Sequence, residues 1–164
     1  MVCVVIIDLE DRKIKICNEI FEIMYGYVQW TNYDTEAGGT ILGRENLGNE
    51  NLVFEFVTKP MEKDIRTKNR FIRKDPEHIE YYKRLYNEHD SVYAYFGEWH
   101  THPEDIPHYS IIDLNNWKKI SKDDPKGMQY HIIVGRKQIR IWEMKRKCLV
   151  PRLVYEVKWD EINL

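Results

Sequence analysis

Cysteine is scarce in this chain. The 164 residues contain three cysteines, Cys3, Cys17 and Cys148, which are far apart and include no CxxC pair. An odd number of distant thiols disfavours both a disulfide framework and a thiolate zinc site. A reducing compartment is therefore the simplest interpretation.

The chain also lacks long hydrophobic runs and a strong excess of one charge. The apolar stretch Val2–Ile7 is too short for a signal peptide or a membrane span, and it runs directly into Asp8 and Glu10. We interpret it as a first strand and expect a cytoplasmic protein with no membrane partner. The formal net charge is -2, so nothing global indicates binding to nucleic acid.

The chain does contain enough apolar side chain for one globular core. Hydrophobic residues make up 43% of the sequence and aromatic residues 13%, which suits one domain of ordinary size. No linker separates a second folding unit. We therefore expect residues 1–164 to form a single domain.

Strand patterns and helix patterns alternate along the sequence. Apolar alternation and β-branched runs predict strands at 2–7, 13–17, 36–43, 51–58, 91–100, 129–135, 138–144 and 149–159. Helical spacing of apolar residues predicts helices at about 19–31, 76–89 and 110–121, the first capped by Asn18 and the second beginning at Pro76. This order predicts an α/β fold, a mixed sheet flanked by three helices.

Residues 59–74 are strongly charged and have no helical period, so we predict a long loop with a short strand near Phe71–Ile72. The basic residues of this insert are Lys59, Lys63, Arg66, Lys68, Arg70, Arg73 and Lys74, and its acidic residues are Glu62 and Asp64. A solvated loop is the simpler interpretation. The alternative is a docking surface for an acidic partner, which would act mainly on the association rate and weaken with salt.

The segment from Gly97 to Trp117, GEWHTHPEDIPHYSIIDLNNW, gathers side chains that bind metals. His100 and His102 alternate in a predicted strand, so they point to one face about 7 Å apart. Asp113 lies in the first turn of the next helix and can approach from the other side. Two imidazoles and one carboxylate leave the fourth position of a tetrahedral zinc site open, as in catalytic sites. The sequence thus predicts one zinc ion per chain, with a bound water that loses its proton near neutral pH.

The other four histidines, His78, His89, His108 and His131, are interpreted as surface groups or hydrogen-bonded structural residues. The alternation around His131 favours a core position. An HxH pair also occurs in amidohydrolase barrels and cupins. A barrel needs roughly 250 residues, more than this chain has. A cupin would need a glutamate ligand a few residues after the second histidine, on the next strand, where this chain has Ile106 and Pro107.

A hydrolase of this kind needs a general base that takes the proton of the water and returns it to a leaving amine. Glu36 is one candidate, because Gly38 and Gly39 beside it allow a substrate or the metal-binding strand to come close. Glu98 is another, because it shares a strand face with His100 and His102 if the strand is regular. The residues alone leave both candidates open.

Ser110 has two compatible interpretations. In the order Ser110-Ile-Ile-Asp113 it can cap the helix, with Asp113 as the reciprocal group of a capping box. Its hydroxyl can also donate to the oxyanion that forms when water attacks a carbonyl. Neither interpretation excludes the other.

Together these residues resemble the JAMM motif of the JAB/MPN metalloproteases. That motif is a glutamate on an early strand, then His-x-His-Pro, six residues, Ser, two residues and Asp. Here it is Glu36, His100-Thr-His102-Pro103, Ser110 and Asp113, with every spacing intact.

The resemblance extends from about Lys13 to Met144. The stretches that carry it are TEAGGTILG, TKP…D, RFIRKDPEH, YFGEWHTHPE, DLNNWKKI and HIIVG. They look like the bacterial branch found beside ubiquitin-like conjugation genes in anti-phage operons. There the peptidase accompanies a cyclic-oligonucleotide synthase (CD-NTase) of the CBASS type.

The resemblance implies a JAB/MPN-like fold, related to cytidine deaminases, and assigns the site. His100, His102 and Asp113 would bind zinc. Glu36 would be the general base, and Ser110 would steady the oxyanion. Glu98 would then belong to the surrounding shell and orient a ligand histidine. One departure is Tyr109, where relatives often carry proline before the serine, which is expected to loosen the loop.

The implied activity is that of a zinc isopeptidase in which a zinc-bound water attacks the carbonyl. Its substrate would be a ubiquitin-like protein or a CD-NTase joined through its C-terminal tail to a target, with an E1/E2-like conjugating protein as a partner by association. The tail would lie extended along a sheet edge. Gly38 and Gly39 are compatible with this, although a tightly packed strand start also explains them. The alternatives are a JAMM peptidase that processes a sulfur-carrier protein and a non-catalytic MPN scaffold, which would usually lack a ligand or the base.

Overall fold

The structure is a computed structural model, and it describes residues 4–164. Val2 and Cys3, which we predicted to begin the first strand, lie outside the described residues. Within 4–164 the main sheet has eight strands in the order β1-β2-β4-β3-β7-β8-β9-β10. These strands are β1 (Val4–Asp8), β2 (Lys13–Cys17), β3 (Gly38–Glu45), β4 (Leu52–Val57), β7 (Ala94–Thr101), β8 (Met128–Val134), β9 (Gln138–Lys145) and β10 (Arg152–Lys158).

The sheet is mixed, as the sequence predicts. Strands β2 and β4 pair in parallel, as do β7 and β8, and the other neighbours pair antiparallel. The described chain has three α-helices, α1 (Asn18–Tyr25), α2 (Glu77–Glu88) and α3 (Ile111–Asp123), and a short 3-10 turn, η1 (Trp159–Glu161). None of its helices is long and apolar enough to cross a membrane.

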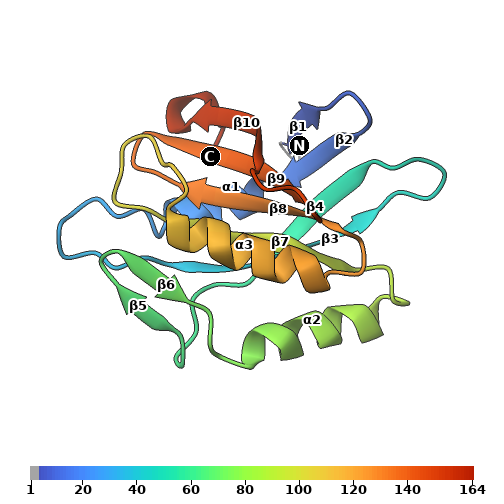
Figure 1. The fold of residues 1–164 in the computed structure, drawn as a ribbon, viewed down its shortest axis with the longest axis horizontal. Coiled ribbons are helices and arrows are strands. Elements are labelled where there is room, and N and C mark those ends of the chain that lie inside the picture. The colour runs from blue at the N-terminus through green and yellow to red at the C-terminus, as the bar shows by residue number, and fades with distance from the viewer. Residues whose placement is uncertain (1–3) are drawn as a thin grey trace.

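Helices α1 and α3 cover opposite faces of the sheet (Figure 1). Ile20, Phe21 and Met24 of α1 join a large core with the inward side chains of the central strands. On the other face, Trp117 of α3 packs with a smaller group that includes Trp142 of β9. Helix α3 thus lies across the central strands, with its first turn near the end of β7.

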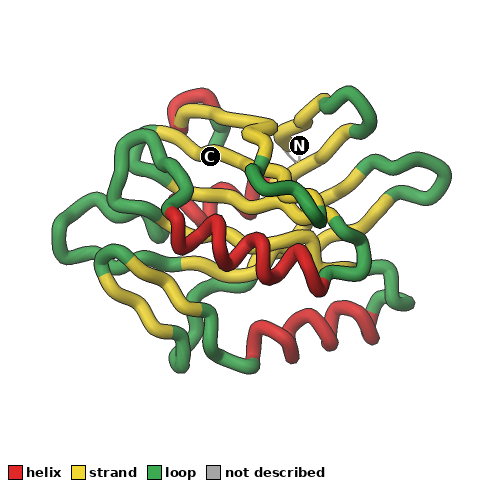
Figure 2. Tube along the Cα trace, viewed as in Figure 1, coloured by secondary structure: helices red, strands yellow, loops and turns green. Residues whose placement is uncertain are grey.

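A separate two-stranded hairpin projects beside the main sheet (Figure 2). It consists of β5 (Ile65–Thr67) and β6 (Arg70–Ile72). The predicted strand near Phe71–Ile72 corresponds to β6, but β5 was not predicted. All three residues of β5 are exposed, so the segment has no apolar alternation to mark it.

Two predictions about the first helix are wrong. The helix ends at Tyr25 and does not continue to about residue 31. Val28 is nevertheless buried, because the loop after the helix returns it to the core at a position that matches helical spacing. Asn18 is the first helical residue and not the cap, and its side-chain amide donates to the Asn163 carbonyl at 2.5 Å.

The third predicted helix is confirmed, beginning one residue after Ser110. The strand predicted at 36–43 begins at Gly38, so Glu36 precedes it.

Candidate metal centre and active site

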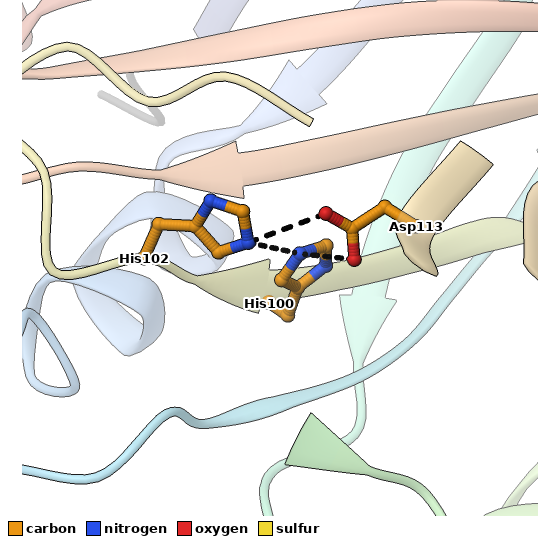
Figure 3. A group of neighbouring side chains, drawn as sticks. All are labelled: His100, His102 and Asp113. Carbon is orange, nitrogen blue, oxygen red and sulfur yellow. Dashed lines mark hydrogen bonds and ion pairs between the residues drawn. The ribbon is translucent and has the colours of Figure 1, made fainter. Parts of the chain in front are cut away.

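His100 near the end of strand β7 and His102 directly after it point to the same side (Figure 3). Thr101 lies between His100 and His102 and is fully buried, with its backbone N–H donating to the Ala37 carbonyl at 2.8 Å. The Thr101 hydroxyl donates to the Gln29 side chain at 3.0 Å. Because Thr101 is fixed in the interior, its two neighbours face the opposite side, as strand alternation predicts.

The three predicted ligands converge (Figure 3). The two histidine Nε2 atoms are 3.0 Å apart. His100 Nε2 lies 3.3 Å from Asp113 Oδ1, and His102 Nε2 lies 3.4 Å from Asp113 Oδ2. Zinc bonds of about 2.0–2.1 Å at tetrahedral angles put neighbouring ligand atoms about 3.3 Å apart. The observed separations are close to this value, although each histidine lies nearest a different oxygen of Asp113, and the donor set is one that zinc accepts.

Asp113 also belongs to the start of α3. Ser110 and Asp113 form the predicted capping box: the Asp113 backbone N–H donates to Ser110 Oγ at 3.2 Å, and Asp113 Oδ2 accepts from the Ser110 N–H at 2.6 Å. The Ser110 hydroxyl donates to the same oxygen at 2.7 Å. The cap therefore fixes the orientation of the carboxylate that faces the two histidines.

The carboxylates and imidazoles of the site shift each other's pKa towards their charged forms. Burial would raise the pKa of Asp113, but hydrogen bonds from His100 and His102 outweigh it and hold that pKa well below its usual value. Burial would lower the pKa of His102, but Asp113 and Glu36 raise it. A carboxylate that stays ionised beside imidazole nitrogens is suited to a divalent cation.

Glu36 lies directly before β3 and is 4% exposed. Its Oε1 atom is 3.9 Å from His102 Nε2. Burial raises the pKa of Glu36 to about 7, although the nearby His102 opposes this shift. The backbone of Glu36 is held by the hairpin: its N–H donates to the Thr67 carbonyl at 2.8 Å, and its carbonyl accepts from Arg66 Nε at 2.8 Å.

Glu98 has a different partner from the one expected. Its Oε1 atom accepts from Arg73 at 3.0 and 2.7 Å. The structure pairs Glu98 with this guanidinium and not with His100 or His102, which corrects the expected contact with a ligand histidine. The ion pair is only partly exposed and lies in the wall of the same cleft.

Close packing explains the two glycines that begin β3, Gly38 and Gly39. A Cβ atom on Gly39 would overlap the Thr58 carbonyl, and one on Gly38 would overlap the Phe71 ring and the Trp99 carbonyl. These are positions where backbone and side chains approach too closely for any other residue.

Tyr109 is tied to aromatic neighbours. Its ring packs against Trp117 and Trp142, with centroids 5.6 and 5.8 Å apart. The loop before Ser110 therefore gains an aromatic anchor where we expected Tyr109 to loosen it.

Trp117 also stacks on His131, with ring centroids 4.4 Å apart. His131 is fully buried, which confirms the predicted core position.

The site opens into a cleft of about 830 Å³. One wall comes from the hairpin and β7, and the other comes from α3. Glu36, His100, His102, Ser110 and Asp113 all line it. The structure thus brings every residue of the predicted motif to one open cleft.

No sequence pattern singles out Arg66, which holds the Glu36 backbone, or Arg73, which pairs with Glu98. Their only visible signal is the charge of the 59–74 insert, which we interpreted as solvated surface. Arg73 lines the cleft directly after β6, and Arg66 in β5 reaches the backbone carbonyl of Glu36.

Comparison with known proteins agrees with this geometry. A family model described as prokaryotic homologs of the JAB domain matches residues 27–145. A protein of Escherichia coli (strain TW11681) named CD-NTase/cGAS isopeptidase is 36% identical over 138 residues, which cover 84% of this chain and 85% of the relative. Proteins of the same name from Vibrio cholerae and Pseudomonas aeruginosa are 27% and 33% identical. The Vibrio match covers 87% of this chain and 88% of the relative, and the Pseudomonas match covers 70% and 72%.

Among solved structures, the solution structure of protein DSY2949 from Desulfitobacterium hafniense is similar, with a TM-score of 0.57 and 16% identity. The match covers 84% of this chain and 88% of that one. At this identity the likeness concerns the fold alone.

Proposed function

This chain belongs to the family of prokaryotic homologs of the JAB domain, and from that premise we propose that it is a zinc-dependent isopeptidase. The observation that carries the proposal is the convergence of His100, His102 and Asp113 at separations of 3.0–3.4 Å, with the Glu36 carboxylate beside them. The substrate we propose is a CD-NTase or a ubiquitin-like protein whose C-terminal tail is joined to a target. The names of the relatives favour the CD-NTase.

His100, His102 and Asp113 would hold the zinc ion. Zinc bound there would supply Lewis acidity, which polarises a carbonyl and lowers the pKa of a water molecule. The Ser110 hydroxyl and backbone N–H fix the Asp113 carboxylate in the orientation that faces both imidazoles. Hydrogen bonds of this kind around a ligand typically determine much of a site's metal affinity.

Glu36 would act as the general base. Its carboxylate is enclosed, lies within reach of the ligand histidines and has a pKa raised to about 7 by burial. A base with a pKa near neutrality can take a proton from the attacking water and give it back to the leaving lysine amine. Glu98, held by Arg73, is not free for this role.

The substrate tail would lie extended in the cleft. An isopeptide bond joins a linear C-terminal tail to a lysine side chain, so the acyl side needs room for several extended residues. Within the described chain, β6 pairs only with β5, and residues 69–73 line the cleft. An extended tail can therefore add its main chain to the free edge of β6.

The test is cleavage of a defined conjugate. The full chain is incubated with a CD-NTase joined through its C-terminus to a lysine of a target protein, and the products are read by mass spectrometry. We expect a new carboxyl terminus at the end of the tail, loss of cleavage with a chelator and recovery when zinc is added. Binding without cleavage by zinc-loaded protein would instead identify a scaffold.

We also assign this activity to a bacterial anti-phage system of the CBASS type. The resemblance to relatives named for CD-NTase supports this assignment. The supporting result would be neighbouring genes for a CD-NTase and an E1/E2-like protein. A neighbouring sulfur-carrier gene would redirect the proposal to processing of that carrier.

A further inference from the structure

Three enclosed polar side chains outside the metal centre are joined in a line. Thr58 Oγ1 lies 2.6 Å from His78 Nδ1, and His78 Nε2 lies 2.8 Å from Asp64 Oδ2. Thr58 and His78 are 2% and 1% exposed, and the Asp64 side chain has no exposed surface. The order of hydroxyl, imidazole and carboxylate is that of a nucleophilic triad. Thr58 Oγ1 is buried and already has three protein partners, the Thr40 N–H, Thr40 Oγ1 and His78 Nδ1, so a substrate cannot reach it and this line is not a second catalytic site.

Each member of the line belongs to a different part of the fold. Thr58 follows β4 and bonds to β3, because its Oγ1 atom accepts from the Thr40 N–H at 2.8 Å. His78 is in the first turn of α2. Asp64 directly precedes β5 and closes the base of the hairpin, since its Oδ1 atom accepts from the backbone N–H groups of Lys74 and Asp75 at 2.8 and 2.9 Å.

The hairpin in turn holds Glu36. The Glu36 N–H donates to Thr67 in β5, and the Glu36 carbonyl accepts from Arg66, also in β5. The next residue, Ala37, bonds to Thr101 of β7. The backbone of Glu36 is thus oriented by the hairpin, while the chain after it is oriented by the main sheet.

We propose that Thr58, Asp64 and His78 are positioning residues for the general base. The line fixes the base of the β5–β6 hairpin to β3 and α2, and the hairpin carries the backbone contacts that aim the Glu36 carboxylate into the cleft. This inference rests on the proposed function for its kinetic consequence, but its structural part is independent of any activity.

The donors and acceptors fit in one direction. An ionised Asp64 only accepts, so His78 Nε2 carries the hydrogen. In a neutral imidazole Nδ1 then accepts from the Thr58 hydroxyl. His78→Phe would remove both bonds while keeping a ring of similar size. His78→Gln can restore the bond to Asp64, and His78→Asn can restore the bond to Thr58.

The first measurement is amide hydrogen exchange on chelated protein. In His78→Phe we expect the Glu36 amide to exchange at least about tenfold faster, because its acceptor Thr67 moves with the loosened hairpin. The Thr101 amide, bonded to Ala37, should keep its protection. Tyr130→Phe, which removes a buried hydrogen bond to Glu143 far from the hairpin, is the matched control and should change neither amide.

The second measurement is kinetics on the cleaved conjugate. Gln29 also holds the hairpin, because its amide donates to the Lys68 carbonyl at 2.9 Å, so the displacement in His78→Phe should be partial. We expect kcat to fall about 10- to 100-fold, as misplacement of a reacting group by a fraction of an ångström to an ångström can cause. KM should change little, zinc should stay near one per chain, and His78→Gln should recover part of kcat.

A lower melting temperature with unchanged Glu36 exchange and unchanged kcat would overturn the inference and leave the line as a stabilising contact only. If His78→Phe does not fold, Thr58→Val and Asp64→Asn test the same prediction, because each keeps the side-chain shape. If no conjugate is cleaved by the wild type, the proposed function fails. The exchange measurement still decides whether the line positions Glu36.

Discussion

Glu36 and Glu98 are both carboxylates in the cleft, but their surroundings separate their chemistry. Glu36 is enclosed near His102 and its pKa is raised to about 7, whereas Glu98 accepts two hydrogen bonds from Arg73. The Glu98 Oε1 atom is therefore already occupied by the Arg73 guanidinium, whereas the Glu36 carboxylate lies beside the ligand histidines. The first prediction follows from this difference.

Glu36→Gln should lower kcat on the order of 10²- to 10⁴-fold, the range that a general base contributes. Zinc content should stay near one per chain, because the three ligand atoms are unchanged. Steady-state kinetics on the cleaved conjugate and metal analysis check both points. Glu98→Gln is the matched control, with a smaller loss expected. Full activity of Glu36→Gln would remove this residue from the mechanism.

Ser110 contributes both to the helix start and to a ligand. Ser110→Ala should reduce the free energy of unfolding by about 1 kcal/mol through loss of the cap. Its zinc affinity should fall about 10- to 100-fold, because Asp113 loses the hydroxyl that orients it. Chemical unfolding and competition with a zinc indicator measure the two effects. Ser110→Thr keeps the hydroxyl and should restore both.

If zinc-saturated Ser110→Ala also loses about 10²-fold in kcat, the hydroxyl supports the oxyanion as well. An unchanged kcat at saturating zinc would restrict Ser110 to the cap and the ligand.

At the scale of elements, the position of α3 depends mainly on one buried aromatic side chain, Trp117. Trp117 is one turn after Asp113 on the same helix face, and it stacks on His131 with ring planes 7° apart. Among the described residues of α3, only Trp117 and Ser121 are buried. The packing of Trp117, including this stack, therefore influences how the helix presents Asp113 to β7.

Trp117→Ala should cost about 3–5 kcal/mol of unfolding free energy, as for other large core side chains. It should also weaken zinc binding, although Trp117 is not a ligand. Trp117→Phe keeps an aromatic ring on His131 and should lose less of both. Lys122→Ala, on the exposed side of the same helix, is the control and should match the wild type. Unchanged zinc affinity in folded Trp117→Ala would contradict a role for the stack in presenting Asp113.

The sequence predicts the elements whose signal is local. The spacing of His100, His102 and Asp113 follows from strand alternation and one helix turn, and the Ser110 cap is a four-residue pattern. The β5–β6 hairpin has no such signal, because its strands are short and exposed. The bonds of Thr58, Asp64 and His78 join residues up to 20 positions apart, so only the folded chain brings them together. The first helix was predicted too long because Val28 is buried from a loop.

For the whole molecule, His131 links folding to pH. Burial lowers the pKa of His131 from an ordinary value of 6.5 to about 3. Above pH 6.5 the imidazole is neutral in both the folded and the unfolded chain, so protonation of His131 does not reduce the free energy of unfolding. As the pH falls below 6.5, the unfolded chain binds a proton that the folded chain excludes, and stability falls until about pH 3.

His131→Phe should therefore flatten the dependence of unfolding free energy on pH between 6.5 and 4, while still offering a ring to Trp117. Urea unfolding of chelated wild type and variant across this range measures the difference between them. The difference should favour the variant increasingly as the pH falls. Parallel curves would show that His131 does not carry this dependence.

That residues 1–164 form a single domain stays a prediction.

One shared atom constrains how this protein can change over generations. Asp113 Oδ2 both faces His102 and accepts the two hydrogen bonds that begin α3. A substitution that removed the Asp113 carboxylate would remove a metal ligand and also weaken the start of α3. Inactive relatives that arose in this way would have a lower free energy of unfolding, and a compensating substitution near the helix start would be needed to restore it.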